Sequence, residues 1–252
     1  MTSNNYTMKV GAGVLSFALL LGMAPTVFAQ TDANSGSSRG FCDRIDQVES
    51  GIKSRISTHK ENLVSKVDVR KSNVEIRFDE RMSTLAENRE MHDENRADRY
   101  AKLSERATTE EQKAAVADFQ TDVEALVVTR KAAVDTAIQA FKDGVTALYS
   151  DKRSEAELNL SAFDDAVDAA ISEARASCTS GTDSKVVRDT LSTEMKNSRA
   201  NLKAARESIK DSSQTELTKL REARKASIQT AVTAYQTALE KEKKDMLPWF
   251  QD

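Results

Sequence analysis

The chain has few of the residues that interrupt regular secondary structure. Of its 252 residues only two are proline, Pro25 and Pro248. Between residues 41 and 247 it has three glycines, namely Gly51, Gly144 and Gly181. A β-sheet protein needs turn residues about every 8–12 positions, and this stretch has nothing comparable. These absences exclude sandwich, barrel and alternating α/β folds and predict an all-α protein.

Aromatic residues and an excess of positive charge are also lacking. Aromatic residues make up 5% of the chain, whereas charged residues make up 31%. This balance favours long amphipathic helices with charged outer faces over a thick globular core. The formal net charge is −3, so there is no domain-wide basic excess to neutralise phosphates. We therefore expect no nucleic acid partner.

The chain has one long apolar run, which lies near its N-terminus. Lys9 precedes the mainly apolar residues 10–23, and the pattern continues to Ala29. This pattern predicts a signal peptide over residues 1–29 that is cleaved between Ala29 and Gln30. An uncleaved anchor is the alternative, but the run is shorter than the ~20 residues that a membrane span needs. The mature chain is then expected to be exported, periplasmic or extracellular, with no membrane span.

A short polar stretch follows the cleavage position. Residues 30–40 (QTDANSGSSRG) are small, polar and poor in apolar side chains. Such a composition is typical of a disordered leader, because it offers little surface to bury. The remaining residues, 41–252, are expected to form one three-helix coiled-coil domain.

Apolar residues recur from Phe41 onward at steps of four, three and four positions. This eleven-residue repeat is typical of helices that pack nearly straight against one another. Three stretches of the repeat predict helices over residues 41–107, 109–178 and 184–246.

Capping signals separate the three predicted helices. Thr108 and Glu111 fit a capping box at the start of the second helix. After that helix, Gly181 suits a left-handed C-terminal position and Asp183 suits the N-cap of the third helix.

The apolar stripes agree in phase when the chain folds back at both turns. Antiparallel pairing of the first and second helices sets apolar residues opposite one another, as in Phe41/Cys178, Phe78/Phe141 and Tyr100/Phe119. The second and third helices pair in the same way, as in Ala174/Leu191, Phe163/Leu202 and Val145/Leu220. The agreement predicts an elongated antiparallel three-helix bundle, a rod of about 90–105 Å at 1.5 Å per residue.

The distribution of charge favours the pairing of the second and third helices. Residues 110–175 carry 14 acidic and 7 basic residues, and residues 183–252 carry 11 acidic and 14 basic residues. An acidic helix beside a basic helix is favourable, although exposed pairs contribute little each.

The chain has only two cysteines, Cys42 and Cys178. The antiparallel register brings both to the same end of the first hairpin. In an oxidising compartment, two such cysteines predict a disulfide, with two free thiols as the alternative. Their spacing excludes a C-x-x-C redox motif, and two cysteines alone cannot form a structural zinc site.

The apolar stripe becomes polar toward the turn between the first two helices. The register places six residues there: Arg89, His92, Arg96, Arg130, Tyr235 and Glu242. One hypothesis is a cationic notch that binds an anionic ligand or partner. The alternatives are arginines that extend to solvent and pair with Glu124 or Glu242, and a polar layer that sets the register.

No residue pattern predicts catalysis, a metal centre or a cofactor. His59 and His92 lie on one predicted helix without metal-ligand spacing, and the Glu-x-x-His motif of di-iron bundles does not occur. Trp249 and Phe250 form the only adjacent aromatic pair. We expect this pair to pack over the end of the bundle, with an exposed contact for a partner as the alternative.

The order of these features supports a resemblance. A signal peptide precedes FCDRI at residues 41–45, a long helix rich in Arg and Glu, and a late ASC at residues 176–178. In this plan the chain resembles uncharacterised exported helical proteins of bacteria, over most of its length. The resemblance implies an exported all-α protein and implies no activity. Periplasmic holdase chaperones share export and long helices, but this chain lacks their basic charge and β-rich trimer core.

These features together predict an exported, non-enzymatic helical rod with a structural or protein-interaction role at the cell envelope. Its expected partner is an unidentified envelope protein, and an oligomer is compatible with the sequence. A periplasmic chaperone-like or ligand-binding helical module is the alternative.

Overall fold

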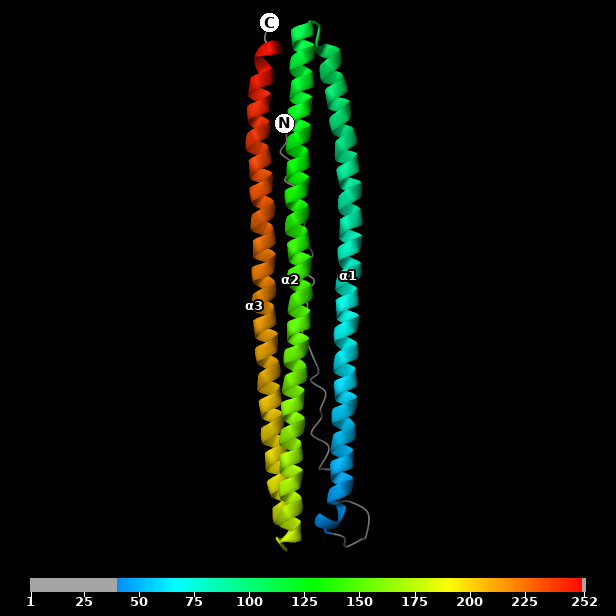
Figure 1. The fold of residues 1–252 in the computed structure, drawn as a ribbon, viewed down its shortest axis with the longest axis vertical. Coiled ribbons are helices and arrows are strands. Elements are labelled where there is room, and N and C mark those ends of the chain that lie inside the picture. Colours follow the sequence, from blue (N-terminus) through cyan, green and yellow to red (C-terminus); the bar gives the residue numbers. More distant parts are fainter. Residues whose placement is uncertain (1–39, 251–252) are drawn as a thin grey trace.

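A computed structural model describes residues 40–250, which form an antiparallel bundle of three long helices (Figure 1). The helices are α1 (Ile45–Arg106), α2 (Glu110–Thr179) and α3 (Ser184–Met246). The short 3₁₀ helices η1 (Cys42–Arg44) and η2 (Leu247–Phe250) precede α1 and follow α3. The prediction of an all-α helical bundle is therefore confirmed. The predicted signal peptide and nearly all of the predicted leader lie outside the described residues.

The turn between α1 and α2 corrects one local prediction. Thr109 is the N-cap of α2: its hydroxyl accepts a hydrogen bond from Gln112 N at 3.2 Å, and Gln112 Oε1 accepts one from Thr109 N at 3.3 Å. The prediction of a capping box between Thr108 and Glu111 was wrong. Gln112 Oε1 also accepts from Thr108 N at 2.8 Å, so one glutamine satisfies donors of both threonines in the turn.

The turn between α2 and α3 has the predicted geometry. Thr182 N donates to Ser177 O at 3.0 Å, and Gly181 between them has φ +83°. This is a Schellman motif, which satisfies carbonyl groups that the end of a helix leaves unpaired. The Asp183 carboxylate then accepts hydrogen bonds from two backbone N–H groups in the first turn of α3, at 3.0 and 3.2 Å. Asp183 is therefore the N-cap of α3.

Side-chain contacts confirm the antiparallel register of both hairpins. Between α1 and α2, the Phe78 and Phe141 ring centroids lie 5.8 Å apart. Between α2 and α3, Leu220 packs against the backbone at Gly144, and the Arg224 guanidinium lies 4.4 Å from the Phe141 ring centroid. The same aromatic ring therefore contacts both neighbouring helices.

The core is thickest at the end of the bundle that holds the cysteines. There, α1, α2 and α3 contribute buried side chains to one cluster, which includes Ile56, Val167, Ile171, Leu191 and Met195. Two smaller clusters follow toward the turn between α1 and α2. No residue of α3 after Leu217 is buried in the described part of the chain.

The two outer helices do not pack equally on α2. The backbone of α3 follows α2 closely along its length, whereas α1 lies at a greater distance (Figure 1). The ion pairs that cross between helices within residues 40–250 join α1 to α2, as Lys53 does with Asp164 and Arg153 does with Asp68. The predicted charge attraction between α2 and α3 therefore does not appear as such pairs, and that interface depends on apolar packing.

Two glycines provide a test of the backbone geometry. We expect Gly51→Ala to raise the free energy of unfolding by about 0.5–1 kcal/mol, since Gly51 is inside α1 and a Cβ there meets no atom within 4 Å. Gly181→Ala should lower it by about 1–2 kcal/mol, because its φ of +83° is unfavourable for other residues. Urea unfolding followed by circular dichroism measures both changes, and shifts of the same sign would contradict this assignment.

Candidate functional site

A disulfide closes one end of the bundle. Cys42 in η1 and Cys178 in the last turn of α2 are bonded, with their Cα atoms 5.6 Å apart, as the sequence predicted. Both side chains are partly buried against the largest core cluster. A bond that spans 136 residues restricts the unfolded chain strongly, so it stabilises the folded bundle.

Arginine and carboxylate side chains reinforce this end. Arg175 of α2 pairs with both Asp46 and Glu49 in the first turns of α1. Its contacts with these two carboxylates raise the pKa of the Arg175 guanidinium. The N-terminal end of α1 is therefore attached to α2 by a covalent bond and by charge.

The arginines of the predicted polar notch are already paired. Arg89 donates to both Asp135 carboxylate oxygens at 2.8 and 3.1 Å. Arg96 donates to both Glu124 oxygens at 2.6 and 2.9 Å and also to Asp93. The hydrogen bonds to Glu124 raise the pKa of Arg96 further above its ordinary value. This geometry corresponds to the paired-arginine alternative.

The remaining notch residues lie apart from these pairs. The Arg130 guanidinium stacks 4.3 Å from the centroid of the Tyr235 ring, at the interface of α2 and α3. His92 is exposed on α1, and Glu242 accepts from Lys241 Nζ at 3.3 Å. Arg89 and Arg96 therefore lie at the interface of α1 and α2, and Arg130 and Tyr235 lie at the interface of α2 and α3.

A series of ion pairs runs along the boundary of α1 and α2, and the sequence did not predict it. Its cations all reach carboxylates of the facing helix; they are Lys53, Arg89, Arg96, Lys131, Lys142, Arg153 and Arg175. The hydrogen bond from Lys131 lowers the pKa of the Asp93 carboxyl group. In the antiparallel register of α1 and α2, acidic residues of one helix lie at the same level as basic residues of the other. This was the sequence signal that could have revealed these pairs.

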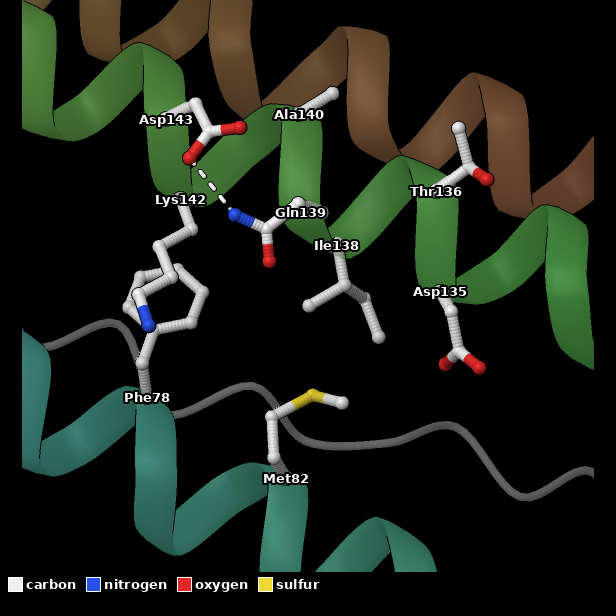
Figure 2. A pocket seen from close by; sticks show the side chains of 9 residues that line it. All are labelled: Phe78, Met82, Asp135, Thr136, Ile138, Gln139, Ala140, Lys142 and Asp143. Carbon is white, nitrogen blue, oxygen red and sulfur yellow. Dashed lines mark hydrogen bonds between the residues drawn. The ribbon is translucent and has the colours of Figure 1, made fainter.

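A small groove opens within this boundary (Figure 2). Phe78 and Met82 of α1 and Ile138 of α2 supply its apolar surface, and its volume is about 540 Å³. Polar side chains surround it; Gln139 Nε2 donates to Asp143 Oδ1 at 2.8 Å at one edge. The groove combines an apolar floor with a charged rim, to which Asp135, Lys142 and Asp143 contribute.

The aromatic pair near the C-terminus lies over the first turn. Gln112 Nε2 donates to Trp249 O at 2.9 Å, which fixes η2 against the start of α2. The Trp249 side chain itself remains 49% exposed, and Leu247 is 50% exposed. The backbone of η2 therefore contacts the start of α2, while part of the apolar surface of Leu247 and Trp249 stays accessible.

His59 of α1 contacts a cation of α3, Arg206. Its Nε2 is 2.7 Å from Arg206 Nη2, so the neutral ring accepts a hydrogen bond from the guanidinium. Burial, together with Arg206 and Lys66, lowers the pKa of His59. The sequence did not reveal Arg206 as the partner of His59, because the predicted register covered only helices that are consecutive in the chain.

Comparison with known proteins adds no relative: neither the scan of family models nor the searches of curated proteins and of solved structures found a match. The fold itself defines the class, an all-α helical bundle joined by one disulfide. Within residues 40–250, no helix has a stretch long and apolar enough to cross a membrane.

Loss of the disulfide should loosen α1 first. We expect Cys42→Ser/Cys178→Ser to lower the free energy of unfolding by at most about 4–5 kcal/mol, as loop entropy predicts for so long a loop. Amide exchange should accelerate most over the first turns of α1, because α1 packs less closely on α2 than α3 does. Mass spectrometry of alkylated peptides provides the control: the oxidised chain should take up no label, and labelling of both cysteines would contradict the bond.

Acid should weaken the contact between α1 and α3 through His59. Because the folded-state pKa of His59 is below the ordinary value of 6.5, its contribution is complete above that pH and is lost as the pH falls from 6.5 toward the folded value. His59→Gln should reduce the fall in stability over this window, measured by urea unfolding at a series of pH values. The matched variant of the exposed His92, His92→Gln, should retain the fall; an equal reduction in both would contradict the assignment.

Proposed function

We propose that this protein is an exported, non-enzymatic helical rod with a structural or protein-interaction role at the cell envelope. The observation that supports the proposal best is its shape: three helices of 62, 70 and 63 residues lie side by side and present a long surface. At 1.5 Å per residue, such helices extend over about 90–105 Å.

The disulfide fits an exported protein. Disulfides persist in oxidising compartments and are rare where thiols are kept reduced. The bond joins the first residues of the domain to the end of α2, beside the largest cluster of buried side chains. The apolar run ahead of the bundle supports export independently of the disulfide, because it predicts a signal peptide over residues 1–29.

Exposed apolar side chains on the rod support contact with a protein partner. Leu158 is 72% exposed, Val69 is 57% exposed and Trp249 is 49% exposed, on three different elements. Single exposed apolar residues are common, so these positions mark where contact can be tested rather than a defined interface.

Two measurements test the proposal. The chain produced in its native host should be recovered outside the cytoplasm with Gln30 as its first residue, which mass spectrometry of the intact protein detects. A photoreactive residue at Val69, Leu158 or Trp249 should then crosslink to one envelope protein. Recovery from the cytoplasm with residues 1–29 retained would overturn the proposal of export.

The alternative is a periplasmic chaperone-like module that uses the same helical surfaces. The two roles differ in an aggregation assay with an unfolded client protein. A rod with a specific partner should leave aggregation unchanged at equimolar concentration, whereas a holdase should suppress it. Suppression together with crosslinks to many different proteins would favour the chaperone role over the rod.

A further inference from the structure

Basic residues of α1 and α3 lie close to one another along the middle of the bundle, as His59 Nε2 and Arg206 Nη2 do at 2.7 Å, and form what we call the basic seam. Its members are His59, Lys66, Arg70, Arg77 and Arg81 on α1 and Arg206, Arg221 and Arg224 on α3. The seam can be followed at three successive positions along the length of the bundle. Arg206 and Lys66 lie close enough to His59 to lower its pKa, and Arg81 and Arg221 act on Arg224 in the same way. Between them, Arg70 and Arg77 approach the Tyr149 hydroxyl of α2.

Helical periodicity keeps acidic residues of α1 away from the seam. The seam cations of α1 follow one another at steps of seven and four residues, which is the eleven-residue repeat, so they share one face. Asp68 and Asp79 project from a different side of α1, where they pair with Arg153 and Lys142 of α2 at 2.9 and 3.7 Å. These two acids of α1 are therefore directed toward α2 and away from the seam.

The seam differs in pairing from the other long boundary of the bundle. At the boundary of α1 and α2 each crossing cation has a carboxylate partner. Within residues 40–250, the seam cations Arg77, Arg81, Arg206, Arg221 and Arg224 form no ion pair. Burial lowers the pKa of the guanidinium groups of Arg206 and Arg224, because a less polar environment disfavours the charged form. Like charges held together in this way favour the binding of an anion.

Apolar side chains lie beside the seam cations on α1. Val69 and Ile76 directly precede Arg70 and Arg77, at the same spacing of seven residues, and are 57% and 52% exposed. Successive residues of a helix are about 100° apart, so these apolar groups form a row that borders the row of cations on α1. The two rows together are the complement of an acidic amphipathic helix. From His59 to Arg81 it extends over about 33 Å at 1.5 Å per residue.

We propose that the basic seam binds an acidic amphipathic helix of a partner protein, which lies along α1 and α3 as a fourth helix. This inference rests on the proposed function, since it gives the chemistry of the partner. The boundary of α1 and α2 supplies the pattern: there, a helix with carboxylates at matching levels pairs with the cations Lys53, Arg89 and Arg96 of α1. The partner helix presents the same pattern to the other side of α1, and guanidinium groups bind its carboxylates through paired hydrogen bonds.

The charge of the whole chain favours a short helix over a long anionic polymer. The net charge is −3, and α2 alone carries 14 acidic residues against 7 basic ones. A polymer that extends past the seam would meet this acidic surface at both ends. A helix of about 22 residues would match the length of the seam and end with it.

The test uses a synthetic helical peptide of about 22 residues, with Glu at steps of seven and four and Leu one position before each Glu. Fluorescence anisotropy measures its binding to the oxidised chain, and a scrambled peptide of equal composition is the control. The patterned peptide should bind at least about tenfold more tightly than the scrambled one. Arg77→Gln/Arg224→Gln should weaken its binding about tenfold or more, because two charge-assisted contacts are lost.

A matched variant separates the seam from general charge. Arg99→Gln/Lys219→Gln removes one cation from each of the same helices away from the seam, and its affinity for the peptide should remain within about twofold. Thermal unfolding of both variants is the control for folding, because Arg224→Gln relieves repulsion but also removes the contact of Arg224 with the Phe141 ring. Should the seam variant fold poorly, Arg77→Lys/Arg224→Lys keeps the charge and should give a smaller loss of affinity.

Three outcomes would overturn the inference. Equal binding of patterned and scrambled peptides, or equal binding by the two glutamine variants, would exclude the seam as a helix site. Tighter binding of inorganic polyphosphate or of phosphatidylglycerol vesicles, lost in the seam variant, would assign the seam to another class of anion. Crosslinking at Leu158 of α2 is independent of the peptide, so the proposed function stands or fails separately.

Discussion

The architecture depends on one constraint, the phase of the apolar stripe of α2 against its two neighbours. Phe141 illustrates the constraint: its ring packs on Phe78 of α1 and also lies under the Arg224 guanidinium of α3. A shift of either outer helix by one residue would rotate apolar side chains out of the interface and bring charged ones in. The two capped turns hold this phase, because each fixes where the next helix begins.

Much of this arrangement could be predicted from sequence, because periodicity and capping are local signals. The lack of proline and glycine indicated helices, the repeat gave their pairing, and the shared end of Cys42 and Cys178 gave the disulfide. The exact capping box was missed, since Thr108 and Thr109 both satisfy the pattern and the choice depends on which one Gln112 contacts. Pattern alone does not distinguish two adjacent threonines.

The candidate sites were harder to predict, because they depend on which side of a helix each charge takes. Arg89 and Arg96 lie in the stripe, which suggested a cationic notch, but carboxylates at neighbouring positions of α2 reach them. The contact of His59 with Arg206 depends on the register of two helices that are not consecutive, 147 residues apart in the chain. That register follows only when both hairpins are considered together, and it brings the cations of α1 near those of α3.

The path of the covalent chain has a mechanical consequence. The described domain begins beside the disulfide and ends at the opposite end of the rod (Figure 1). Tension applied between these two ends would enter at Cys42, cross the disulfide to Cys178 and continue through the second turn into α3. The covalent loop of α1 and α2 would carry none of this tension. The load would pass along α3, which is held to α2 by apolar contacts. The bond that closes the bundle therefore also determines which helix would bear force.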